Sequence, residues 1–148
     1  MSDLDSVLKD SLKNSSSHTR KVYSQNPLTA DEVIDLANSR VLTLAATVRP
    51  NRRPHLSPSD LVVVDRVFYL GVDSVTARFR NLKNNPATTV MLADGSKRQA
   101  ILEGTAIFLD MKSPTAERVL AAQKKKYGWV TDALAEFNIV KAFTWKRE

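Results

Sequence analysis

The sequence predicts a mainly β (α+β) fold, a six-stranded antiparallel barrel with flanking helices. Two observations support this prediction. Short runs rich in β-branched and apolar residues, such as "VLTLAATV" (41–48) and "VFYLGV" (67–72), are separated by tight turns. Other segments combine a helical spacing of apolar residues with capping residues at their ends. The chain of 148 residues has the length of one domain and can bury a core.

The chain divides into a polar arm and a folded domain. Residues 1–26 are polar and include "LKNSSSHTRK" (12–21), so we expect a flexible arm there, within which Val7 and Leu12 could form part of a short helix. The domain covers residues 27–148. It begins with a helix in "LTADEVIDLANSR" (28–40), where Thr29 and Glu32 have the spacing of a capping box.

The first three strands are expected to form an antiparallel meander. They cover 41–48, 55–64 and 67–72, and Pro58 inside the second run indicates an edge or a bulge. A helix at 76–84 follows and ends before Pro86. Strands at 88–94 and 98–110, a helix from Ser113 to Gly128 and a last strand at 138–146 complete the prediction.

Composition and charge narrow the possible partners. The net charge of +6 favours nucleic acid, an acidic membrane or a phosphorylated ligand. The chain has no cysteine, which excludes disulfides and thiol chemistry, and its two histidines are too few for a convincing metal site. The sequence shows neither a signal peptide nor a run long enough to span a bilayer. We therefore expect a soluble cytoplasmic domain without a metal or a membrane partner.

The stretch "SVTARFRNLKNNP" (74–86) holds the best candidate site. Unpaired N–H groups at the start of its helix favour an anion, and Ser74, Thr76, Arg78 and Arg80 could bind a phosphate there. The alternative is a solvated helix that packs inward through apolar residues at i and i+3. The pattern of residues leaves both interpretations open, and the two are compatible.

Two more basic clusters have competing interpretations. "RPNRR" (49–53) is a charged hairpin tip or a further anion site. "KKKYGW" (124–129) fits a nucleic-acid patch, but lysines at a helix C-terminus that complement the dipole explain it better. The carboxylates of Asp60 and Glu103 form no recognisable acid–base pair, and no nucleophile motif is present. We therefore assign no catalytic residue, and the chain fits a cofactor-dependent enzyme or a binding protein.

The order of these segments resembles a known family. From "VLTLAATVRPNRRPHLSPSDLVVVDRVFYLGV" through "RNLKNNP" to "RQAILEG", the sequence is similar to the FMN-binding split barrel of the pyridoxamine 5'-phosphate oxidase-like superfamily. The resemblance implies a six-stranded antiparallel split β-barrel that forms a homodimer with the cofactor at the subunit interface. It implies an FMN-dependent oxidoreductase acting on a small organic substrate. The alternatives are a reductase using the deazaflavin coenzyme F-420 and a non-enzymatic haem- or flavin-binding module.

The resemblance also assigns candidate residues. Thr76, Ala77 and Arg78 match the phosphate-binding positions, with Arg80 as compensation for Ala77, and Gln99 matches a flavin contact. Arg49 and its two neighbouring arginines would meet the acidic tail of a deazaflavin. The full set of cofactor-binding candidates is Arg49, Ser57, Pro58, Ser59, Tyr69, Leu70, Gly71, Thr76, Arg78, Arg80 and Gln99.

Two further expectations follow. Val62 stands where true oxidases of the family carry a substrate-binding lysine, so we expect no oxidation of vitamin B6 phosphates. The run "LVVV" (61–64) lacks polar alternation, which indicates cover by a second subunit, the alternative being cover by the helix at 113–127. Nucleic acid is not expected, because only Phe68 and Tyr69 are aromatic residues suitably placed on the strands.

Overall fold

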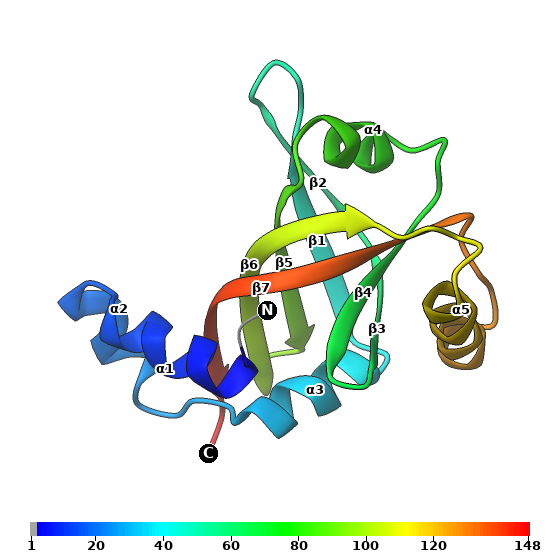
Figure 1. Cartoon of the computed structure of the whole chain (residues 1–148). Coiled ribbons are helices and arrows are strands. Elements are labelled where there is room, and N and C mark those ends of the chain that lie inside the picture. Colours follow the sequence, from blue (N-terminus) through cyan, green and yellow to red (C-terminus); the bar gives the residue numbers. More distant parts are fainter. Residues whose placement is uncertain (1–2) are drawn as a thin grey trace.

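The computed structural model describes residues 3–148. The helices are α1 (Leu4–Lys13), α2 (Ser17–Tyr23), α3 (Ala30–Asn38), α4 (Ala77–Asn84) and α5 (Pro114–Tyr127). The strands are β1 (Leu42–Val48), β2 (Pro54–Pro58), β3 (Asp60–Val64), β4 (Val67–Val72), β5 (Ala87–Asp94), β6 (Arg98–Phe108) and β7 (Ala133–Lys146). Figure 1 shows α1, α2 and α3 at one end of the curled sheet and α4 at the other.

All strands belong to one antiparallel sheet, in the order β2-β1-β5-β6-β7-β4-β3. The two edge strands, β2 and β3, are consecutive in the chain and are separated only by Ser59. The sheet must therefore curl until its two edges meet at this residue. The Ser59 N–H still donates to the carbonyl of Thr43 on β1, at 3.0 Å, so the crossing stays attached to the first edge.

The mainly β barrel with flanking helices is confirmed, but the strand count differs. The run expected as one strand at 55–64 forms both β2 and β3, because Pro58 cannot donate to a ladder and ends the first of them. The expected meander is wrong. β1 pairs with β2 and β3 pairs with β4, and these hairpins lie at opposite ends of the strand order.

The predicted helix ends are confirmed. The Thr29 hydroxyl and the Glu32 side chain form the capping box of α3, and Thr76 caps α4. Ser113 caps α5 and is followed by Pro114 at the first helical position. Gly128 ends α5 with a φ of 84°, a left-handed conformation that glycine adopts without a steric cost. These ends were predictable because a cap uses groups only a few residues apart.

The segment expected as a loose arm contains helices. α1 packs on β7, where Val7 joins the barrel core with 4% of its surface exposed. The Ser11 hydroxyl donates to the Val7 carbonyl (2.7 Å) and accepts from the Ala142 N–H (2.9 Å). The sequence does carry a signal for α1, since Leu4, Val7, Leu8 and Leu12 recur at helical spacing.

The run "LVVV" is covered within the chain, so the reason given for a second subunit there is wrong. Leu61 lies inside the barrel with none of its surface exposed. Val62 packs on the other side of the sheet with Tyr69, Val119 and further residues of α5, and 3% of its surface is exposed. The competing interpretation, cover by the helix at 113–127, is the one that the structure shows.

A β-bulge between Glu103 and Gly104 shifts the register of β6 against β7. A Cβ on Gly104 would lie 1.9 Å from the carbonyl oxygen of Asn138 on β7. A contact this short with a backbone atom forces the strands to move. Glycine at 104 therefore permits the close approach of the two longest strands of the sheet.

We predict that Gly104→Ala lowers the free energy of unfolding by about 3 kcal/mol, the upper end of the usual cost of overpacking. Thr105→Ala on the same strand serves as the control and should cost less than about 1 kcal/mol. Urea unfolding measures both changes. Equal free energies for the Gly104 variant and the wild type would contradict the close approach.

Candidate cofactor-binding site

Arg78 lies at the start of α4 and joins the edge strand β2 to β4, the strand next to the other edge. Only 8% of its surface is exposed. Its Nη1 donates to the Ser57 hydroxyl (2.8 Å) and to the Pro58 carbonyl (2.7 Å), both on β2. Its Nη2 donates to the carbonyl of Gly71 on β4, at 3.3 Å. One guanidinium group therefore links β2 to β4 across the gap where the two ends of the curled sheet approach each other.

The charge of Arg78 has no ionic partner among residues 3–148. Its bonds go to neutral oxygens, no ion pair involves it in this part of the chain, and its buried Nε has no hydrogen-bond partner there. Burial lowers the pKa of Arg78, while the more distant charges of Asp60 and Asp73 raise it. A buried, unpaired cation is costly, so this position favours an anion.

The hydroxyls expected to help with a phosphate are used by the protein itself. The Thr76 hydroxyl accepts from the Phe79 N–H (3.2 Å) and donates to the Asp73 carbonyl (2.7 Å). Ser74 donates through its N–H (2.7 Å) and its hydroxyl (2.5 Å) to the Asp132 carboxylate, which lowers the pKa of Asp132. The Asp132 carboxylate therefore uses the Ser74 donors that were expected to bind a phosphate.

The inward packing of α4, the competing interpretation, is present as well. Leu82 is 3% exposed and belongs to the barrel core. The ring of Phe79 lies 4.8 Å from the ring of Phe108 on β6. Arg80, two residues after Arg78, is exposed, and its guanidinium donates to the Val75 carbonyl at 3.4 Å. The structure therefore separates Arg80 from the buried guanidinium.

The strand candidates differ in what they present. On β2, Ser57 is half-buried and Pro58 is exposed, and the buried Ser59 follows with its hydroxyl on the Asp60 carbonyl. On β4, Leu70 points into the barrel core and Tyr69 packs against α5, where burial raises the pKa of its phenol. From these strands, Arg78 is hydrogen-bonded by the Ser57 side chain and by the backbone carbonyls of Pro58 and Gly71.

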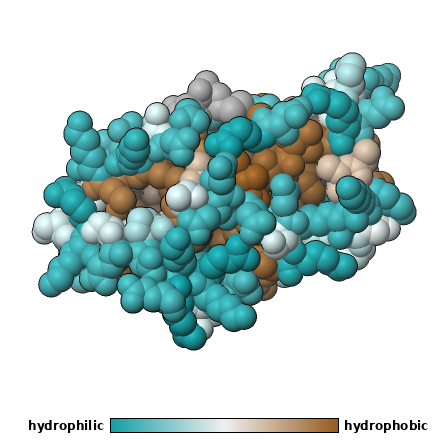
Figure 2. Space-filling view, turned by 90° about the horizontal axis from the view of Figure 1, so that it is seen from below, coloured by the Kyte–Doolittle hydropathy of each residue, from teal (hydrophilic) through white to brown (hydrophobic). Residues whose placement is uncertain are grey.

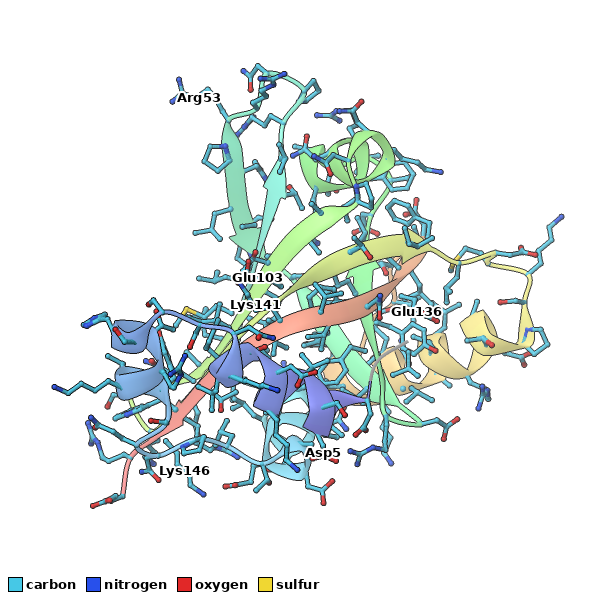
Figure 3. The ribbon with its side chains drawn as sticks, turned by 60° about the vertical axis from the view of Figure 1, so that its left-hand side comes forward. Asp5, Arg53, Glu103, Glu136, Lys141 and Lys146 are labelled. Carbon is cyan, nitrogen blue, oxygen red and sulfur yellow. The ribbon has the colours of Figure 1, made fainter. Side chains whose placement is uncertain are left out.

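Gln99 lies away from Arg78 in one chain, whereas Arg49 lies on the hairpin at the same end of the barrel as α4. Gln99 pairs with Trp145 near the start of β6, whereas Phe108 at the end of β6 contacts α4. At about 3.3 Å per residue, this spacing amounts to roughly 30 Å. Arg49 is exposed at the tip of the β1–β2 hairpin, and Figure 3 shows its neighbour Arg53 at the outer end of this hairpin.

A polar network beside Gly71 was missed by the sequence analysis. The Asp60 carboxylate accepts from Trp129 Nε1 (2.7 Å) and from Gln123 Nε2 (3.0 Å), and Gln123 also bonds Thr131. A Cβ on Gly71 would lie 2.2 Å from Gln123 Nε2, so a larger residue there would displace the Gln123 amide from this network. The available sequence signal was a polar residue, Gln123, among the apolar positions of a helix. The structure buries this side chain, with 1% of its surface exposed, so its amide needs hydrogen-bond partners.

The lysines of "KKKYGW" act within the chain. Lys124 donates to the carbonyl of Gly128, as expected at a helix C-terminus. The Lys126 ammonium donates to the carbonyls of Ala37 on α3 and Leu61 on β3, each at 2.6 Å, and so ties three elements together. Burial lowers the pKa of Lys126 to about 8, against the opposing attraction of Asp60.

We predict that Lys126 makes stability depend on pH. Above a pH of about 8 the folded chain releases a proton that the unfolded chain holds up to 10.5, so the free energy of unfolding rises with pH in this window. After allowance for partial exposure, the rise is on the order of 1 kcal/mol. Urea unfolding at about pH 7.5 and about pH 9.5 should show it in the wild type and not in Lys126→Met. A variant that keeps the full rise would contradict the assignment to Lys126.

Two classes of feature do not occur in residues 3–148. No helix in this range combines the length and the apolar character needed to cross a membrane. No three or more acidic or histidine side chains gather there in a way that could hold a metal ion.

Comparison with known proteins agrees with this architecture. No curated protein is similar enough in sequence to count as a match. The structure is similar to a conserved hypothetical protein from Mycobacterium tuberculosis, with a TM-score of 0.67 and 21% identity over 80% of this chain and 85% of that chain. It is also similar to HutZ, the heme storage protein from Vibrio cholerae (TM-score 0.59, 16% identity, 80% and 89% covered). A third similar structure is an F420 reductase (TM-score 0.59, 18% identity, 73% and 93% covered).

These structural likenesses establish the fold, and the sequence establishes the family. The model of the family described as pyridoxamine 5'-phosphate oxidase matches residues 29–145. This range runs from the cap of α3 to the next-to-last residue of β7 and includes Arg78 with its hydrogen-bond partners Ser57, Pro58 and Gly71. The chain belongs to the pyridoxamine 5'-phosphate oxidase family.

Proposed function

We propose that this protein binds FMN and is an oxidoreductase that transfers hydride to or from a small organic substrate. The observation that carries the proposal is the buried guanidinium of Arg78, which has no ionic partner within residues 3–148. A phosphate would compensate this charge and accept from the free Nε. Family membership supports the same assignment.

The residues around Arg78 fit one end of such a cofactor. Arg78 would hold the phosphate, together with N–H groups of the first turn of α4 that lack intrahelical partners. Ser57 would contact the polar edge of the ring, and the backbone of β2 and β4 would line it. The flavin, when bound, supplies the hydride chemistry. The chain binds and orients it, and the apolar strands beside it exclude water.

Vitamin B6 phosphates remain outside the proposed substrates. Val62, which stands at the lysine position of the true oxidases, faces α5 and is 3% exposed. An apolar, buried side chain offers nothing to a substrate phosphate. The proposed substrate is therefore a small organic molecule without this recognition element.

The deazaflavin coenzyme F-420 is the second candidate cofactor. The exposed arginines at 49, 52 and 53 gather at the tip of the β1–β2 hairpin, and α4 packs against β1 at the same end of the barrel. No ion pair involves these arginines within residues 3–148. They would meet an acidic tail that FMN lacks. A similar structure is an F420 reductase, which supports this alternative at the level of the fold.

We predict that Arg78→Ala weakens FMN binding by about 1.5–3 kcal/mol, roughly tenfold or more, the scale of a hydrogen bond to a charged group. Arg80→Ala, an exposed neighbour on the same helix, serves as the matched control and should change the affinity by less than about threefold. Arg78→Lys keeps the charge and should retain part of the affinity. Fluorescence titration with FMN measures all three.

The outcome depends on the protein remaining folded. Because Arg78 also joins β2 to β4, urea unfolding of each variant must accompany the titration. Equal FMN affinities for folded Arg78→Ala and the wild type would remove Arg78 from the site. A visible spectrum of the purified protein separates flavin from deazaflavin, and from haem, the cofactor of the non-enzymatic alternative.

We also propose a homodimer with the cofactor at the subunit interface. The outward face of β2, β1, β5, β6 and β7 exposes Leu42, Leu56, Ile107 and Val140, each with 57–63% of its surface accessible. A groove of about 340 Å³ crosses this face. Figure 3 shows Glu103 and Lys141 side by side on it, on paired strands, so the patch offers opposite charges to a symmetric copy.

The position of Gln99 supports the same proposal. One chain holds Gln99 and Arg78 near opposite ends of the barrel, so Gln99 would reach a shared cofactor only from a second subunit. This arrangement would place the cofactor between the outward face of one copy and Arg78 of the other. Large apolar patches on a soluble chain are usually covered by a partner.

We predict a mass of twice 16.5 kDa by light scattering. Leu56→Glu places a charge on the proposed interface and should shift the mass toward the monomer and lower the bound flavin together. Val22→Glu on α2 is the matched control, because Val22 is also exposed (40%) and lies off this sheet face. A monomeric wild type with a full complement of flavin would contradict the shared site.

A further inference from the structure

A second pocket lies at the end of the barrel opposite α4. It has a volume of about 240 Å³ and lies between α1, the segment that leads into α3, and β7. Its wall includes Leu8, Leu12, Tyr23, Leu28 and Phe143. Figure 1 places α1, α2 and α3 together at this end, far from α4. Figure 2 views the molecule from this side and shows hydrophobic areas between hydrophilic side chains.

The pocket is built by fixed contacts rather than left by loose packing. The Ser11 hydroxyl accepts from the Ala142 N–H at 2.9 Å and holds α1 on β7. The Arg20 guanidinium donates to three carbonyls at the end of α1 and beyond, at 2.9–3.2 Å, and fixes α2 against it. The Leu28 N–H donates to the Thr144 hydroxyl at 2.8 Å and holds the third wall.

The interior is apolar and aromatic. The rings of Tyr23 and Phe143 lie 5.3 Å apart at an angle of 43° and form one wall. The hydroxyls of Thr29 and Thr144 both accept from backbone N–H groups. Apolar cavities hold water poorly, and an apolar cavity of about 150 Å³ can bind benzene. A pocket of this size and lining therefore fits a molecule with one or two aromatic rings.

The rim adds a polar element. Asp5 and Lys9 line the pocket one turn apart on α1, so they lie on the same side of the helix. They offer one acceptor and one donor to a substituent on the ring system. The combination of an apolar interior with a polar rim is typical of sites for small amphipathic ligands.

We propose that this pocket is a binding site for a small aromatic molecule that carries one polar substituent, separate from the site at Arg78. The ring system packs against Tyr23 and Phe143, and the substituent lies at the rim beside Asp5 and Lys9. The site is complete within one chain. It does not depend on the proposed cofactor, because none of the residues that line it belongs to α4 or β2.

The probe for the test is 2-naphthol, titrated into the full-length protein and followed by the amide signals in two-dimensional NMR. Saturable shifts centred on residues 8–12, 23–30 and 142–144 are expected. Leu8→Trp fills the pocket and should weaken binding at least tenfold. Ser6→Trp introduces the same side chain at an exposed position of α1 and should change the affinity by less than twofold.

The wild-type titration decides the proposal even if Leu8→Trp does not fold. Shifts that do not saturate, or that centre on Gly71 and Arg78, would overturn it. Equal affinities of folded Leu8→Trp and Ser6→Trp would overturn it as well. A rise in the thermal midpoint of the wild type with 2-naphthol, absent in Leu8→Trp, is the expected independent readout.

Discussion

The crossing of the chain from β2 to β3 is the constraint on which the rest of the structure depends. Because consecutive strands form the two edges of one sheet, the sheet has to curl until these edges meet at Ser59. Arg78 then joins β2, one of these edges, to β4, the strand next to the other edge, through the Pro58 and Gly71 carbonyls. The positive charge that the proposed cofactor would need is therefore also part of the closure of the barrel.

This closure places an unusual electrostatic demand on one residue. A guanidinium that is 8% exposed and donates only to neutral oxygens has lost most of its hydration without gaining a hydrogen-bonded counter-charge. On the other side of Gly71, Gln123 and Trp129 both donate to Asp60. Asp60 pairs with Gly71 across β3 and β4, so these hydrogen bonds from Gln123 and Trp129 help to fix the strand whose carbonyl accepts from Arg78. The Asp60 carboxylate is hydrogen-bonded to these two donors rather than to Arg78.

The two ends of the barrel have different roles in this arrangement. The end at α4 holds the buried cation and the basic hairpin tip, as Figure 1 and the exposed arginines of residues 49–53 show. The other end is closed by α1 and α3, whose residues Val7 and Leu36 belong to the barrel core. The outward sheet face between these ends is the large surface on which apolar side chains remain exposed.

The sequence by itself determined the features that depend on nearby residues. The caps at Thr29, Thr76 and Ser113 use hydrogen bonds that span three residues, and the break at Pro58 follows from its missing N–H. Only the tertiary structure decided which strands became neighbours, that Arg78 turned inward, and that Gln99 lay far from it in one chain. Those outcomes arise from contacts between residues distant in sequence, where burial and strand pairing outweigh any local pattern.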